Sequence, residues 1–228
     1  MKTRKPLSRD RVLTAAIALA DERGVQDLTM RKLAKELGVE AMSLYNHVGN
    51  KDDLIDGMID IVFSEIEPPS SGVDWKTAMR NRAMSTREAL RRHPWAIGEM
   101  EGRGSHGPSN LRIHDAVLGC LRGAGFSLEM TVHAYSMQDA YIYGFALQEK
   151  TLGLATPQSA GEAARRRAQA NAALVDDYPY LAEIVAKLPD AGYDTAVEFA
   201  WGLDLILDGL DRRRRDEASQ ARPSRVPG

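Results

Sequence analysis

Residues 40–47 carry side chains whose types suit contact with duplex DNA better than burial in a protein core. Leu44 is the anchor expected to point inward, and its neighbours are mostly small, polar or aromatic. Such side chains can reach base edges and phosphates when a short helix lies in the major groove, which is about 12 Å wide. The candidate contacts are Ala41, Met42, Ser43, Tyr45, Asn46 and His47.

Two short helices joined by a glycine turn must position these side chains. Apolar residues at i, i+3, i+4 and i+7 predict a first helix over 30–37, with Thr29 as its N-cap. Gly38 can adopt the left-handed conformation that ends a helix, and a second helix over 40–47 completes a helix-turn-helix pattern. Helical hairpins with a glycine turn are common, so the pattern alone leaves other roles open.

A further amphipathic helix is expected to support this pair. The apolar run Val12–Ala20 follows the basic residues Met1–Lys5, an order that also occurs in signal peptides. Asp10 and Arg11 directly precede the run, however, and Ser8 suits the N-cap of a helix. An amphipathic first helix that ends at Gly24 is therefore the better interpretation, and the single cysteine of the chain, Cys120, fits a reducing cytoplasm.

Charge and cysteine content exclude several classes of protein. Residues 1–51 hold ten Lys and Arg against six Asp and Glu, whereas the whole chain has a net charge of −2. A basic head on an acidic body indicates a polyanionic partner for the head alone. Cys120 is the single cysteine, which excludes an intrachain disulfide and a zinc finger. No run of about 20 apolar residues could span a membrane.

The remaining periodicity predicts an all-α fold. Apolar stripes alternate with loops rich in Pro, Gly and Ser, and no strand pattern appears. We expect a three-helix DNA-binding domain over 1–50, a helical ligand-binding and dimerisation domain over 51–215, and a disordered tail over 216–228. The expected helices of the second domain are 51–66, which connects the two domains, 74–92, 109–123, 127–149, 162–175, 179–187 and 194–215.

The head resembles the DNA-binding domain of the tetracycline-repressor (TetR) family. The likeness is carried by LTMRKLAKELGVE at residues 28–40, by LYNHV at 44–48 and by Asn50-Lys51. It runs from about Ser8 to Phe63 and continues more weakly into the last helix. Asn46 departs from the pattern, because tetracycline repressors have tryptophan there.

The resemblance implies roles for seven residues at the DNA. Arg31 would read a base, since its fork fits guanine, and Met42 and Ser43 would face base edges. Three of these residues also have an ordinary structural explanation. Thr29 is explained as a helix cap, Lys51 as a solvated surface residue, and Tyr45 as a side chain that partly fills the apolar core beneath the second helix. The phosphate contacts implied by the resemblance are Thr29, Tyr45, His47 and Lys51.

The last helix is too broadly apolar to pack against its own domain alone. A second copy of the chain is the natural cover, and a buried central helix of a monomer is the alternative. We expect a dimer built from this helix and from the helix over 127–149. The apolar side chains of the last helix are Val197, Phe199, Ala200, Trp201, Leu203, Leu205, Ile206, Leu207 and Leu210.

The resemblance also implies a cavity for a small-molecule effector. Methionine suits an adaptable pocket and an ordinary core alike. Thr86 or His114 could supply a hydrogen bond to the ligand. The residues expected to line the cavity are Thr86, Met100, His114 and Val117, together with Met137 and Tyr141 on the helix over 127–149.

A magnesium–tetracycline complex is not the expected effector. By alignment, Met100 stands where tetracycline repressors have a metal-binding histidine, and a thioether is too soft a ligand for magnesium. Gln148 replaces an acidic residue and Val117 replaces an amide. The expected ligand is therefore largely apolar, without a metal or other cofactor.

These features predict a homodimeric transcriptional repressor that a small ligand releases from a palindromic DNA operator. No His-Glu-x-x-His pattern, nucleophile elbow or phosphate loop appears, so no enzymatic activity is expected. Two alternatives remain: a helical ligand-binding or catalytic protein with an incidental basic head, and a constitutive DNA-binding protein without a ligand.

Overall fold

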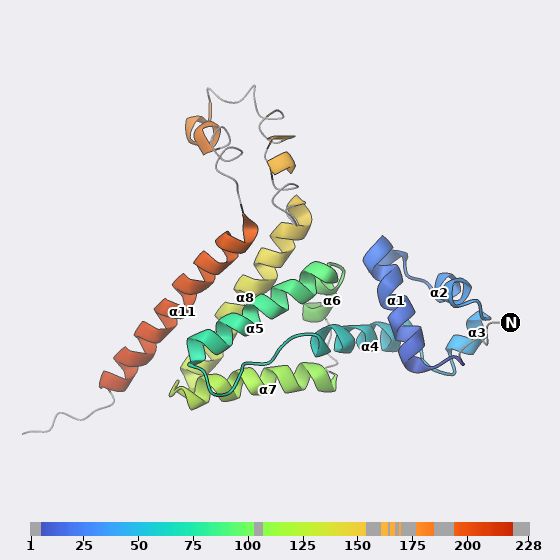
Figure 1. Ribbon diagram of the computed structural model, residues 1–228, viewed down its shortest axis with the longest axis horizontal. Coiled ribbons are helices and arrows are strands. Elements are labelled where there is room, and N and C mark those ends of the chain that lie inside the picture. The colour runs from blue at the N-terminus through green and yellow to red at the C-terminus, as the bar shows by residue number, and fades with distance from the viewer. Residues whose placement is uncertain are drawn as a thin grey trace, which may run out of the picture. The chain divides into compact units, whose positions relative to one another are not determined.

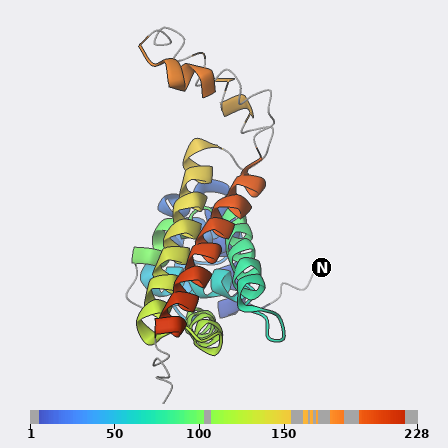
Figure 2. The same ribbon diagram turned by 90° about the vertical axis from the view of Figure 1, so that its left-hand side faces the viewer.

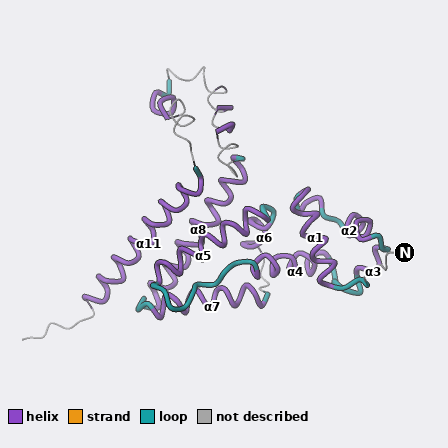
Figure 3. The backbone as a smooth tube through the Cα atoms, in the orientation of Figure 1, coloured by secondary structure: helices purple, strands orange, loops and turns teal. Residues whose placement is uncertain are grey.

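The computed structural model contains only helices as regular elements in the part of the chain that it describes. The absence of strands from these residues confirms the all-α fold (Figure 1, Figure 3). Contacts divide the chain into two compact units, residues 1–120 and 121–228, and each is described by itself. The described residues are 6–102, 107–153, 161–163, 165, 166, 169, 177–184 and 194–220.

The first unit begins with a three-helix head. Helix α1 (Arg9–Arg23) packs on α2 (Met30–Leu37) and on α4 (Lys51–Ser64), and α2 packs on α3 (Ala41–Leu44). Figure 1 shows α1, α2 and α3 as one cluster from which α4 leads away. Each large apolar side chain buried here stabilises the fold by roughly 1.5–3 kcal/mol, so the three helices form a stable support for the exposed residues. The side chains with no exposed surface include Val12, Ala16, Leu33, Leu44, Leu54 and Met58.

The predicted caps begin and end the helices of the head. The Ser8 hydroxyl accepts a hydrogen bond from the Arg11 amide at 3.3 Å, and the Thr29 hydroxyl accepts one from the Lys32 amide at 3.2 Å. Gly38 ends α2 with a positive φ of 64°. The first two predicted helices are therefore confirmed, with a 3-10 turn at Val25–Asp27 between them.

The third helix is shorter than the predicted span of 40–47. Helix α3 ends at Leu44, and a turn carries the chain on to His47. The carbonyl of Leu44 accepts hydrogen bonds from the amides of both His47 and Val48, at 2.9 and 3.0 Å. This shared acceptor tightens the last turn, as is common where a helix ends.

Three further helices complete the first unit, with α7 crossing its boundary. Helices α5 (Trp75–Arg92), α6 (Ala96–Gly102) and α7 (Pro108–Gly123) follow in order, and α4 packs against α5 and α6. The α7 amides of Ser109 and Asn110 donate to Asp60 of α4, at 2.8 and 3.4 Å. Helix α6 is not among the helices that the sequence predicts, and residues 103–106 lie outside the described part.

The second unit is built around two long helices that lie side by side, α8 (Leu128–Leu152) and α11 (Thr195–Gln220) (Figure 2). The ring of Tyr141 stacks on Phe199 with the centroids 5.3 Å apart. Its hydroxyl donates to the Phe199 carbonyl at 3.0 Å. Gly202 faces this ring, and a Cβ there would approach its Cζ atom to 2.9 Å. The absence of a side chain at Gly202 is what permits the crossing.

The last helix continues beyond its predicted end at Arg215. It reaches Gln220, so residues 216–220 are helical and the predicted tail is wrong at that point. Arg214 donates to the Ala124 carbonyl at 3.0 Å and pairs with Asp211 at 2.8 Å, which fastens this end of α11 to the turn that precedes α8. Residues 221–228 lie outside the described residues. So do most residues of the two helical pieces predicted over 162–175 and 179–187. Within the second piece, residues 179–184 are described and are helical.

Candidate nucleic-acid interface and effector site

Residues 41–47, here called the recognition segment, present their polar and aromatic side chains outward from a buried anchor. Leu44 is fully buried, whereas Met42 is 74% exposed and Tyr45 is 44% exposed. Ser43 and His47 are half-buried. A segment with one inward anchor and several outward side chains can enter a groove without disturbing the core beneath it.

The other predicted DNA contacts lie on α2 and α4. Thr29 caps α2 and is exposed, and Arg31 is exposed in the first turn of the same helix. Lys51 is exposed as the first residue of α4. The structure thus leaves all three accessible, but the roles of the seven predicted residues at DNA stay predictions.

Arg9 and Asp53 fasten the end of the recognition segment to α1 and α4. Arg9 Nη2 and Nη1 donate to the two carboxylate oxygens of Asp53, at 2.7 and 3.1 Å, and Nη1 also donates to the His47 carbonyl at 2.9 Å. Asp53 accepts a further bond from the Gly49 amide at 2.7 Å. The Arg9 bond, and secondly the Gly49 bond, lower the pKa of Asp53 to about 2.

Sequence analysis missed this pair because Arg9 and Asp53 are 44 positions apart and belong to no chemical motif. An acidic residue in the first turn of a helix is adequately explained by the helix dipole. Only the fold shows that the carboxylate of Asp53 also has a guanidinium and a loop amide as partners.

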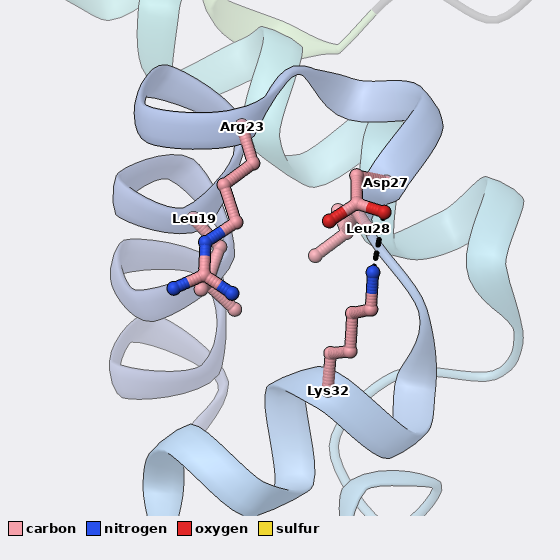
Figure 4. A pocket seen from close by; sticks show the side chains of 5 residues that line it. All are labelled: Leu19, Arg23, Asp27, Leu28 and Lys32. Atoms are coloured by element: carbon pink, nitrogen blue, oxygen red, sulfur yellow. Dashed lines mark hydrogen bonds and ion pairs between the residues drawn. The ribbon is translucent and has the colours of Figure 1, made fainter.

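A shallow depression on the head is too small to be an effector pocket. It has essentially no internal space for even a water molecule and lies where α1 faces α2 (Figure 4). Lys32 forms an ion pair with Asp27 across it, and its hydrogen bond lowers the pKa of that carboxyl. Ligand pockets usually enclose about 300–1,000 Å³. The residues lining the depression are Leu19, Arg23, Asp27, Leu28 and Lys32.

Four of the predicted effector contacts lie on helices of the first unit. Thr86, Met100 and Val117 are buried, on α5, α6 and α7 respectively. The Thr86 hydroxyl donates to the Arg82 carbonyl at 2.8 Å. His114 is half-buried, and its ring meets the Phe63 ring of α4 edge-on, with the centroids 6.1 Å apart.

The remaining two predicted contacts belong to the second unit. Met137 is 52% exposed on α8, whereas Tyr141 has its hydroxyl bonded to the backbone of α11. Tyr141 therefore has a packing role that the sequence did not indicate. The convergence of the six predicted residues on one cavity stays a prediction.

Sequence analysis also missed a buried cation beside Thr86. Arg82 is only 1% exposed and lies one turn before Thr86 on α5, and Arg87 on the same helix is 8% exposed. The helix that carries Thr86 therefore also holds two buried arginines. A signal was present in the sequence, because Arg82 falls between the apolar residues Met79 and Ala83.

A cluster of polar side chains joins α1 to the turn between α5 and α6. His93 places Nδ1 2.8 Å from Asp21 of α1 and Nε2 3.2 Å from Glu65, the residue that ends α4. The Trp95 indole donates to the same Asp21 oxygen at 2.7 Å, and Arg92 pairs with Glu65 at 2.6 Å. His93 and Trp95 are 7% and 5% exposed, so these two buried side chains link α1 to the turn between α5 and α6.

Two kinds of site are absent from the described part of the chain. No group of three or more His, Cys, Asp or Glu side chains there could hold a metal ion. None of the helices in the same ranges is long and apolar enough to cross a membrane.

Comparisons with known proteins match both parts of the chain. The family model described as "Bacterial regulatory proteins, tetR family" matches residues 12–58. The model described as "Tetracyclin repressor-like, C-terminal domain" matches residues 68–214. Together they cover the recognition segment and the described helices from α5 to most of α11.

Several relatives are similar over nearly their whole length. The HTH-type transcriptional repressor DrrR1 of Streptomyces coeruleorubidus is 33% identical over 223 residues, covering 93% of this chain and 82% of that protein. The class A tetracycline repressor from transposon 1721 of Escherichia coli is 33% identical over 211 residues, covering 89% and 90%. The crystal structure of ActR from Streptomyces coelicolor in complex with actinorhodin has a TM-score of 0.73 at 27% identity, covering 92% and 99%. The chain therefore belongs to the tetR family of bacterial regulatory proteins.

Proposed function

We propose that the protein is a cytoplasmic, homodimeric transcriptional repressor that a small, largely apolar ligand releases from a palindromic operator. One observation carries the proposal: a tetR-family chain displays Met42 and Tyr45 outward from the buried anchor Leu44. Two similar proteins support the proposal. DrrR1 is named a transcriptional repressor, and ActR was crystallised in complex with actinorhodin. Regulation rather than catalysis is the proposed role.

Exposed apolar side chains on α11 support the dimer. Val197, Trp201 and Leu205 recur every four residues and are 62%, 66% and 56% exposed. Such a stripe on one long helix is a typical oligomer interface. Helix α8 adds Leu128 and Val132, which are 73% and 54% exposed. We propose that these two helices meet their counterparts from a second copy.

The buried link at His93 supports a route from effector to head. Met100, a proposed effector contact, lies on α6, which begins directly after Trp95. Trp95 and His93 both hold Asp21 of α1. A ligand that displaces α6 would thus pull on α1, and through α1 on the recognition segment. We propose the division into a head over 1–50 and a body over 51–215 on the same grounds.

Two substitutions at the head test the proposed DNA contacts. Arg31→Ala is expected to cost about 1–3 kcal/mol of operator binding and to relax the sequence preference, because a bidentate base contact is lost. Lys51→Ala should weaken all sequences alike and flatten the dependence on salt, because a phosphate contact is lost. Titration of labelled duplexes at several salt concentrations measures both effects. Unchanged preference in the Arg31 variant would refute the assignment of Arg31.

Tetracycline with magnesium is expected to leave the operator complex intact. Met100 offers a soft thioether where a hard magnesium ion needs oxygen or water ligands. An uncharged aromatic compound should be the better class of effector. Fluorescence anisotropy of the operator complex during drug titration measures release, and magnesium-dependent release at micromolar tetracycline would contradict the argument.

A further inference from the structure

The end of the recognition segment is held at two peptide groups, one on each side of Val48. Arg9 binds the carbonyl of His47, and Asp53 binds the amide of Gly49. Arg9 and Asp53 are joined to each other by two further hydrogen bonds, at 2.7 and 3.1 Å. Helix α1 and helix α4 thus grip the same short stretch of backbone, and the four bonds together are called the clamp below.

The recognition segment needs such support because its own helix is minimal. Helix α3 has four residues, too few to persist without tertiary contacts. Leu44 anchors the middle of the recognition segment and Val48 anchors the chain directly after it, since both side chains are buried. Apolar contacts fix the depth of the segment, but directional hydrogen bonds are better suited to fixing its rotation.

The clamp contributes little to stability. The side chains of Arg9 and Asp53 are 44% and 38% exposed, and ion pairs this exposed are usually worth little. Its geometry is nevertheless specific, because a guanidinium fork meets both carboxylate oxygens while one of its nitrogens also reaches a carbonyl. Such an arrangement is well suited to aiming neighbouring side chains.

We propose that Arg9 and Asp53 are positioning residues for operator reading, which set the angle of the recognition segment through the backbone of His47 and Gly49. This inference rests on the proposed DNA-binding function. The two residues act through the segment, which itself presents Met42, Ser43 and Tyr45. The Arg9 bond holds the pKa of Asp53 at about 2, so its carboxylate stays ionised into the acid range in which an ordinary aspartate becomes protonated.

The sign of the effect distinguishes a positioning role for Asp53 from the direct effect of its charge on DNA binding. DNA is a polyanion, so removing a carboxylate from the head should by itself tighten binding. The clamp predicts the opposite for Asp53→Asn, because the fork loses its charged acceptor. Arg9→Lys keeps the charge but cannot form the bidentate pair, so it should also weaken operator binding.

Asp27→Asn is a matched control. Asp27 belongs to the same head and pairs with Lys32, and its side chain is 44% exposed against 38% for Asp53. Neither member of that pair has a contact with the recognition segment among its described hydrogen bonds and ion pairs. Removing this carboxylate changes the charge as Asp53→Asn does and leaves the clamp intact.

The test uses the full-length protein and a duplex that the wild-type protein selects from a random pool. Dissociation constants for that duplex and for an unrelated duplex of equal length are measured at one salt concentration, and thermal melting is followed in parallel. Asp53→Asn and Arg9→Lys should each weaken the selected duplex about tenfold and the unrelated one by less than about threefold. The double variant should lose no more than the single variants, since both break one unit.

Each outcome decides the matter. If both variants melt normally and bind the selected duplex as tightly as wild type, or if Asp53→Asn binds more tightly as Asp27→Asn should, the inference is wrong. Should Asp53→Asn fail to fold, Arg9→Lys decides alone. If the wild-type protein selects no duplex at all, the proposed function fails, and the inference with it.

Discussion

Leu205→Glu is expected to convert the protein from a dimer to a monomer and to weaken operator binding at least about hundredfold. Leu205 is 56% exposed in the exposed apolar stripe of α11. In the dimer, the glutamate would be buried without a partner, which is costly. A monomer then engages one half-site without the gain that tethering two heads provides. Sedimentation velocity reports the mass, and operator titration reports the affinity.

Leu111→Glu provides the matched control for this substitution. Leu111 lies on α7 and is 55% exposed, so the same chemical change is made at the same exposure outside α8 and α11. This variant should remain a dimer. A Leu205 variant that sediments as a dimer at micromolar concentration would contradict the proposed interface. So would a Leu111 variant that dissociates.

Gly202→Ala should lower the free energy of unfolding by about 2–3 kcal/mol. The new Cβ would lie 2.9 Å from Cζ and 3.1 Å from Cε2 of Tyr141, closer than carbon atoms approach. Either Tyr141 leaves the Phe199 carbonyl or α8 and α11 move apart, and overpacking of this kind typically costs about 1–3 kcal/mol. Denaturant unfolding at one fixed protein concentration measures the change, because dimer stability depends on concentration.

Gly119→Ala should instead raise the free energy of unfolding. Gly119 lies within α7, is exposed, and has nothing within 4 Å of a Cβ built there. Alanine restricts the unfolded chain and favours the helix, so this variant should gain about 0.5–1 kcal/mol. Equal effects at the two glycines would show that the Tyr141 contact does not govern the result.

Local patterns in the sequence predicted the head well. The caps at Ser8 and Thr29, the helix end at Gly38 and the burial of Leu44 all follow from rules that act within a few residues. The length of α3 did not follow from them. Its end depends on the shared carbonyl of Leu44, and periodicity carries no information about that choice.

Contacts between distant residues could not be predicted in this way. Asp21 meets His93 across 72 positions, and Arg9 meets Asp53 across 44. Each of these residues has an adequate local explanation as a surface charge or a helix-end residue. Only the packing of α1 against other elements of the first unit shows what they hold.

In the body too, the sequence pattern does not determine which neighbour a side chain contacts. Tyr141 was placed in the effector cavity from its helix face, yet its hydroxyl is bonded to α11. A tyrosine in a helix can turn toward a ligand or toward a neighbouring helix, and the two choices have the same sequence periodicity. The burial of Arg82 is not predicted because a charged residue is rarely buried, although Met79 and Ala83 lie near it on the same helix.

Selection of duplex DNA by the purified full-length protein tests the central claim most directly. After several rounds from a random pool, the enriched sequences should contain two inverted half-sites whose centres lie about 34–36 Å apart, one helical turn. That spacing follows from a two-fold dimer in which each head presents one recognition segment. Enrichment of no sequence, or of a single half-site without its inverted partner, would contradict the account.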